Sequence, residues 1–107
     1  MRVAITSTGN SLESKVDNRF GRCSYFVFYD TESESVEFLP NANRESVEGA
    51  GPASVQTVAS RDVRKVVSGE FGAKVKAIFD QLQIQLIMVP DSNHTVAQII
   101  EMLKNNN

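Results

Sequence analysis

The chain has 107 residues, 41% of them hydrophobic, which is typical of a globular protein with one core, so we expect a single domain over residues 1–107. Its 11 basic and 13 acidic residues give a formal net charge of −2, which argues against a nucleic-acid partner because such proteins usually present a basic surface. Its one cysteine excludes an internal disulfide, and no apolar stretch is long enough for a signal peptide or a membrane span, so we expect a cytoplasmic protein without a membrane partner.

The first half of the chain predicts three strands. A short β-branched run covers Arg2 to Thr6, and an aromatic run covers Tyr25 to Tyr29. A polar turn over Asp30 to Ser35 leads into a third run, Val36 to Leu39, which closes at Pro40. The short polar link between the second and third runs predicts an antiparallel hairpin.

The second half alternates helical and strand patterns. Pro52 suits the first turn of a helix, and Asn93 is a candidate cap for the last one. Two groups of apolar residues have the same helical spacing and lie 21 positions apart in the sequence. Val75 corresponds to Val96, and Leu82 corresponds to Leu103. The expected elements are a helix over Pro52 to Ala59, a strand over Val63 to Val67, a helix with Val75, Ile78, Phe79 and Leu82, a strand over Ile84 to Val89, and a helix with Val96, Ile99, Ile100 and Leu103. This alternation predicts an α/β fold with a mixed five-stranded sheet and helices on both faces.

Four loops are expected to meet at one edge of this sheet, which is the usual ligand site of such folds. They are Ser7 to Ser14, Glu48 to Pro52, Gly69 to Gly72, and Pro90 to Thr95. Three of the loops lead into helices, whose N-termini favour anions. The segment from Arg19 to Cys23 adds two guanidinium groups and a thiol.

The candidate ligand-binding residues follow from these loops, and each has a purely structural alternative. Cys23 is the candidate metal ligand, with a pKa lowered by flanking arginine, or else a small core residue. The arginines either neutralise an anion or form surface ion pairs, as Arg19 would with Asp17. The glycines either admit a ligand or serve turns and caps, and His94 either ligates or is solvated. The candidate cofactor-binding residues are Ser7, Asn10, Arg19, Gly21, Arg22, Gly49, Gly51, Gly69, Gly72 and His94.

The sequence resembles the dinitrogenase iron–molybdenum cofactor biosynthesis family over nearly its whole length. The stretch S-K-V-D-N-R-F-G-R, residues 14–22, lies between a first strand and an aromatic strand, and Gly49 to Pro52 match the family's first helix start. The closing helix matches at Thr95, Val96, Ile100 and Leu103. The resemblance implies a ribonuclease H-like three-layer α/β fold and carriage of an iron–molybdenum-type cluster or its precursor. The orange protein of sulfate reducers, a relative of similar size, holds a molybdenum–copper sulfide cluster.

The chain also differs from this family pattern before the first helix. Many relatives carry a His-rich loop there, whereas residues 41–48 contain no His and no Cys. The position after F-G-R is commonly small and is Cys23 in this chain. Two functions therefore stay open: a monomeric carrier of an anionic metal–sulfur cluster, or a regulatory or interaction module of the same fold that has lost the cofactor. Cofactor-assembly or regulatory proteins are the expected protein partners.

Enzymatic functions have weaker support in the sequence. A two-metal nuclease needs clustered carboxylates that begin on the first strand, and Arg2 to Thr6 contains none. The chain has no Walker motif, and Gly49 to Pro52 lack the third glycine of a dinucleotide-binding fingerprint. We therefore expect a binding protein and not an enzyme.

Overall fold

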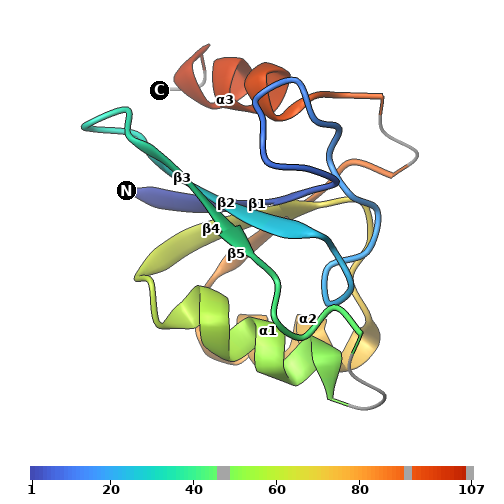
Figure 1. Cartoon of the computed structure of the whole chain (residues 1–107). Helices are drawn as coiled ribbons and strands as arrows, with labels where there is room; N and C mark the ends of the chain where they lie inside the picture. The colour runs from blue at the N-terminus through green and yellow to red at the C-terminus, as the bar shows by residue number, and fades with distance from the viewer. Residues whose placement is uncertain (46–48, 91–92, 106–107) are drawn as a thin grey trace.

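The computed structural model describes residues 1–45, 49–90 and 93–105, and these form one mixed sheet with helices on both faces (Figure 1). The strand order is β3-β2-β1-β4-β5. β2 is antiparallel to both of its neighbours, whereas β1, β4 and β5 are parallel to one another. The elements are β1 (Arg2–Ser7), β2 (Tyr25–Asp30), β3 (Val36–Pro40), α1 (Ala50–Ala59), β4 (Val63–Ser68), α2 (Ala73–Gln81), β5 (Gln85–Met88) and α3 (Val96–Asn105).

The predicted elements are confirmed in number, type and order, and most ends agree to within two residues. The start of the last helix is a correction. Asn93 is not its cap, because Thr95 takes that place: its hydroxyl accepts a hydrogen bond from the Gln98 N–H at 3.1 Å, and the Gln98 side chain accepts one from the Thr95 N–H at 2.8 Å. This reciprocal pair is a capping box. Leu82 is a second correction, since it follows α2 and is 48% exposed instead of facing the core.

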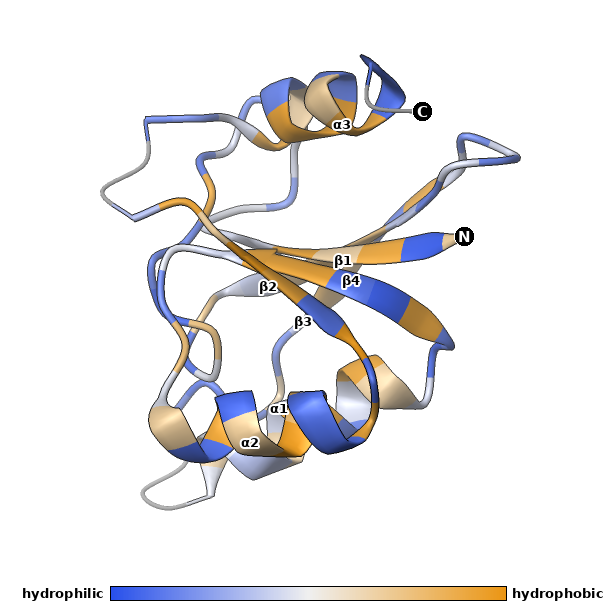
Figure 2. Cartoon of the chain, turned by 180° about the vertical axis from the view of Figure 1, so that it is seen from behind, coloured by the Kyte–Doolittle hydropathy of each residue, from blue (hydrophilic) through white to orange (hydrophobic). Residues whose placement is uncertain are grey.

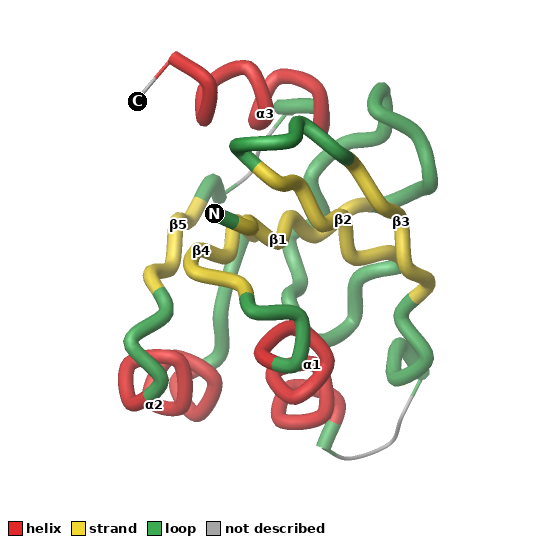
Figure 3. The backbone as a smooth tube through the Cα atoms, turned by 90° about the vertical axis from the view of Figure 1, so that its left-hand side faces the viewer, coloured by secondary structure: helices red, strands yellow, loops and turns green. Residues whose placement is uncertain are grey.

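The side chains of the central strands alternate between two apolar cores, one on each face of the sheet. In β2, Phe26 and Phe28 pack with α1 and α2, whereas Val27 and Tyr29 pack with α3. This alternation follows from the two-residue period of a strand. Figure 2 shows the apolar strands between the two helical layers, and Figure 3 shows α1 and α2 on one side of the sheet with α3 on the other. Among the described residues, no helix is both long and apolar enough to cross a membrane.

One edge of the sheet gathers most of the connecting segments, as predicted. The parallel strands β1, β4 and β5 all end there, because Ile5 pairs with Val67 and Val67 with Ile87. The antiparallel strand β2 begins at this edge, where Tyr25 pairs with Ser7, and β3 ends there beside Tyr25 at Pro40. Residues 46–48 and 91–92 lie outside the described residues, and of these Glu48 and residues 91–92 belong to two of the predicted ligand loops.

Candidate functional site

An open cleft of about 450 Å³ lies at this edge, on the side of the sheet that α1 and α2 cover. It is formed by the segment before β2 and by the N-terminal ends of the two helices. The lining residues are Asn18, Arg19, Phe20, Gly21, Arg22, Gly49, Ala50, Gly51, Glu70, Phe71, Gly72 and Val75. The cleft therefore brings together six of the predicted binding residues, namely both arginines and four of the glycines.

The segment that carries Arg19 is fixed to the sheet through one backbone carbonyl. The Asp17 carbonyl accepts hydrogen bonds from the Thr6 hydroxyl at 2.8 Å, the Ser68 hydroxyl at 3.3 Å and the Gly69 N–H at 3.1 Å. Thr6 and Ser68 are fully buried at the ends of β1 and β4. A side chain on Gly69 would overlap Asn18, so glycine at this position lets the segment lie directly against β4. Gly69 thus supports the cleft from behind.

The N-terminus of α1 opens into the cleft without a side-chain cap. Its N-cap is Gly49, whose φ of 73° is in the left-handed region that favours glycine. Pro52 lies in the first turn, as predicted, and contributes no N–H, so Ala50 and Gly51 supply the N–H groups that this turn leaves without a helical acceptor. A Cβ on Gly21 would lie 3.0 Å from the Gly51 nitrogen, so the two glycines allow the loop and the helix to approach closely.

The N-terminus of α2 meets the same cleft. Its N-cap is Gly72, which has an extended conformation and provides no side-chain hydrogen bond. A Cβ on Gly51 would lie 2.9 Å from a methyl carbon of Val75, so the first turns of α1 and α2 are in close contact. Two helix N-termini, each with a partial positive charge and uncapped N–H groups, therefore line one cleft.

The third helix N-terminus does not join this site, which corrects the expectation that three would. The first N–H groups of α3 are already bonded within the chain: Val96 donates to the Ser14 carbonyl at 2.8 Å and Ala97 to the Leu12 carbonyl at 2.9 Å. The Thr95 and Gln98 N–H groups are bonded in the capping box. α3 also covers the opposite face of the sheet, so its helix dipole does not act on the cleft.

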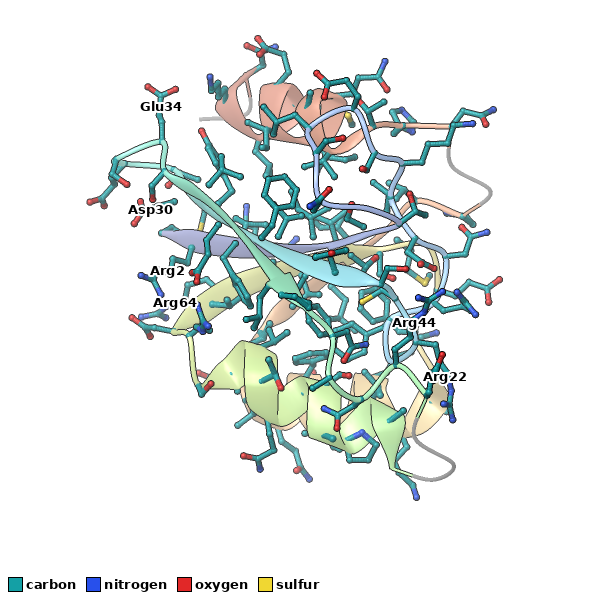
Figure 4. All side chains as sticks on the ribbon, in the orientation of Figure 1. Arg2, Arg22, Asp30, Glu34, Arg44 and Arg64 are labelled. Atoms are coloured by element: carbon teal, nitrogen blue, oxygen red, sulfur yellow. The ribbon has the colours of Figure 1, made fainter. Side chains whose placement is uncertain are left out.

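Two full positive charges stand at the cleft beside these helix ends. The Arg19 Nε lies 3.4 Å from the buried Asp17 carboxylate, and 59% of the Arg19 side chain is exposed. The predicted ion pair between these residues is thus present, but its Asp17 carboxylate is buried and not at the surface. Arg22 donates from Nη1 to the Arg44 carbonyl at 3.1 Å. Figure 4 shows Arg22 and Arg44 at the same end of the molecule, and Arg2 and Arg64 at the other end.

Cys23 lies below the cleft in the apolar core and is fully buried. Burial, with a smaller effect from the Asp17 carboxylate, raises the pKa of the Cys23 thiol from 9.0 to about 12. Arg19 does lower this pKa, as expected, but its effect is the smallest, so the expectation of a lowered thiol pKa is wrong. A neutral thiol is a poor metal ligand, so the burial favours the alternative of a core residue. The Asn41 amide donates to the Gly21 and Cys23 carbonyls, both at 3.0 Å, and fixes this turn.

Three of the predicted binding residues lie away from the cleft. Ser7 is buried and its hydroxyl donates to the Gly9 carbonyl at 2.6 Å, whereas Asn10 is exposed in the following loop. His94 is exposed near the start of α3, and its carbonyl accepts a hydrogen bond from the Val16 N–H at 3.0 Å. Their role as binding residues stays a prediction, for a ligand that would have to reach the α3 side of the edge.

The structure also adds residues that the sequence pattern did not single out. Asn18, Phe20 and Glu70 line the cleft, and Arg44 is joined to Arg22 through its carbonyl. Arg44 could have been found from the sequence as the basic residue of the polar loop before α1. This loop differs from the family pattern chiefly in its lack of His and Cys. Among the described residues, no group of three or more His, Cys, Asp or Glu side chains could share one metal ion.

Comparisons with known proteins agree with the overall fold. The sequence profile of the dinitrogenase iron-molybdenum cofactor family matches residues 1–106. The apo form of the orange protein from Desulfovibrio gigas superposes with a TM-score of 0.89 at 27% identity, over 98% of this chain and 88% of that chain. A Thermotoga protein provisionally named NifB gives a TM-score of 0.78 at 32% identity, over 97% of this chain and 87% of that chain.

Two further comparisons set the limits of this similarity. A Methanocaldococcus jannaschii protein provisionally named a dinitrogenase gives a TM-score of 0.67 over 99% of this chain and 89% of that chain. Its identity is 16%, so this likeness concerns the fold alone. No functionally curated protein matches the chain.

Proposed function

This chain belongs to the dinitrogenase iron-molybdenum cofactor family, and we propose that it is a cytoplasmic carrier that binds an anionic metal–sulfur cluster, or the precursor of one, in the cleft. The observation that carries the proposal is the meeting of two uncapped helix N-termini with Arg19 and Arg22 around one opening. Partial and full positive charges at one site select an anion. The protein's task is to hold and deliver the cluster, without catalysis.

The donor set of the cleft suits a preassembled cluster that brings its own sulfide ligands. The lining offers guanidinium and backbone N–H donors, which bind the outer sulfur or oxygen atoms of an anion, and these outnumber the one carboxylate of the lining, that of Glu70. Gly21, Gly49, Gly51 and Gly72 keep the backbone accessible at the cleft, and Gly69 supports it from behind. An iron–molybdenum-type cluster and a molybdenum–copper sulfide cluster both present such a surface. Cys23 would become a metal ligand only if its turn moved to expose the thiol.

Full charges are needed because helix ends alone contribute little at an exposed site, about 0.3–1 kcal/mol each. We therefore expect the double variant Arg19→Ala, Arg22→Ala to bind an anionic cluster at least roughly tenfold more weakly, equivalent to about 1.4 kcal/mol. The measurement is a titration of the metal-free protein with tetrathiomolybdate and copper, followed by the visible absorption band of the bound cluster.

Arg64→Ala is the matched control, because Arg64 is exposed at the opposite end of the molecule (Figure 4). This variant removes one arginine charge, against two in the double variant, and should bind like the wild type. If the double variant also kept wild-type affinity, charge recognition at the cleft would be rejected. If the wild type gave no visible band at all, the result would favour the regulatory or interaction module without a cofactor.

A further inference from the structure

The strand β5 forms one margin of the sheet and differs from the strand at the other margin. In the strand order only β4 pairs with β5 (Figure 3). The opposite margin, β3, carries Glu37 and ends at Pro40, both of which discourage strand pairing. The residues of β5 are Gln85, Leu86, Ile87 and Met88, with no charge and no proline. Apart from its length of four residues, this margin therefore lacks the charge and the proline that discourage pairing with another strand.

Apolar grooves accompany β5 on both faces of the sheet. On the α2 side, a groove of about 700 Å³ is lined by Phe71, Lys76, Asp80, Ile84, Gln85, Leu86 and Met88. On the α3 side, a smaller pocket of about 70 Å³ is lined by Val67, Ile87, Val89, Ile99, Met102 and Leu103. Met88 is 52% exposed and Met102 46% exposed. Exposed methionines adapt their shape readily to an apolar partner.

We propose that β5 is a docking edge for a second copy of this chain, whose own β5 pairs with it in the antiparallel direction. A two-fold axis perpendicular to the sheet relates the two copies, so their sheets join into one continuous sheet. The α2 layers of both copies then lie on one face of this sheet, and the α3 layers lie on the other. Side chains opposite one another must then point to the same face. With the axis at Ile87, Leu86 of one copy lies opposite Met88 of the other, both on the α2 side.

The charges along the groove are complementary under this same symmetry. Lys76 and Asp80 lie one turn apart on α2, and both line the groove beside β5. The two-fold axis reverses the direction of the second helix, so Lys76 of each copy comes toward Asp80 of the other. A self-complementary pair of opposite charges beside an uncharged strand is what a two-fold contact requires. Under this proposal the protein forms a concentration-dependent dimer, in contrast to the monomer that the sequence analysis expects.

The test is the oligomeric state of the cluster-free protein, measured by sedimentation equilibrium over a wide range of protein concentration. The wild type should rise from the monomer mass of 11.8 kDa toward twice that value as its concentration rises. Lys76→Asp places like charges opposite each other and should raise the dimer dissociation constant at least roughly tenfold. The double variant Lys76→Asp, Asp80→Lys restores opposite charges and should restore the dimer.

Two further variants keep the test specific to this edge. Lys74→Asp makes the same charge change on an exposed α2 residue that does not line the groove, and should leave the dimer unchanged. Met88→Lys places a charge on the exposed edge and should give a monomer. A wild type that is monomeric at every concentration, or a dimer that withstands Lys76→Asp, would overturn the proposal. Because no cluster is present, neither result bears on binding in the cleft.

Discussion

Cys23 illustrates how far residue-scale chemistry depends on burial. Its position beside arginine predicted an activated thiolate, but the side chain points into the core, where its pKa rises to about 12. The spacing of residues in the sequence does not show which way a side chain at a strand start points. Arg19 and Arg22 were predictable, because charged side chains in a glycine-containing turn seldom enter a core.

The raised pKa of Cys23 predicts an alkaline loss of stability. The folded state holds the thiol proton up to about pH 12, whereas the unfolded state releases it above 9.0, so the folded state is favoured fully below 9.0 and less as the pH rises toward 12. Between about pH 8 and about pH 10 the loss from this group is on the order of 1 kcal/mol. Urea unfolding of the wild type and Cys23→Ala at both pH values measures it. The variant should show the smaller decline, and equal declines would mean that the Cys23 thiol does not cause the loss.

At the scale of elements, the strands and helices were predictable from apolar periodicity, because the cores impose the two-residue and 3.6-residue periods directly. The start of α3 was not predictable from the stripe alone. Asn93 and Thr95 are both good caps by residue type, and the choice depends on Gln98 and on the Ser14 and Leu12 carbonyls that bond the first turn. The sequence could not show that this helix end is already occupied.

The uncapped start of α2 predicts a conflict between stability and binding. Gly72 has the extended conformation of an N-cap and open space around its Cα, so a serine at this position can cap the helix. Gly72→Ser should be about 1 kcal/mol more stable than Gly72→Ala. It should also bind tetrathiomolybdate with copper more weakly, because the added hydroxyl occupies an N–H that the anion would use. Thermal unfolding and the visible titration of both variants test this, and a serine variant that gained stability with unchanged affinity would remove this helix end from the site.

At the scale of the whole molecule, parallel strand ends were enough to predict that the loops converge, but not which loops share one cleft. That choice depends on the faces of the sheet: α1 and α2 cover one face and α3 the other. The sequence pattern does not reveal on which face each helix packs. Six predicted residues therefore meet in the cleft, whereas Ser7, Asn10 and His94 do not.

The overall charge makes a further prediction about binding. The chain carries a formal net charge of −2, so its distant field repels an anion and the attraction must be local to the cleft. At 0.1 M salt, the interaction between partly exposed charges is screened over a distance of about 10 Å. The dissociation constant for an anionic cluster should therefore rise as salt is added. The salt dependence should be smaller in the double variant Arg19→Ala, Arg22→Ala than in the wild type or Arg64→Ala. Titrations at several salt concentrations measure this, and equal slopes in all three proteins would contradict it.

The cleft is assembled from three segments, within residues 18–22, 49–51 and 70–75, which together span just over half of the chain. During synthesis on the ribosome, the hairpin of β2 and β3 and the first turn of α1 emerge before α2 exists. At that stage a nascent chain has only part of the cleft lining, because the residues from Glu70 to Val75 are still missing. Under the proposed function, loading therefore depends on the synthesis of residues up to 75 and on the packing of α2 beside α1, and does not by itself require α3.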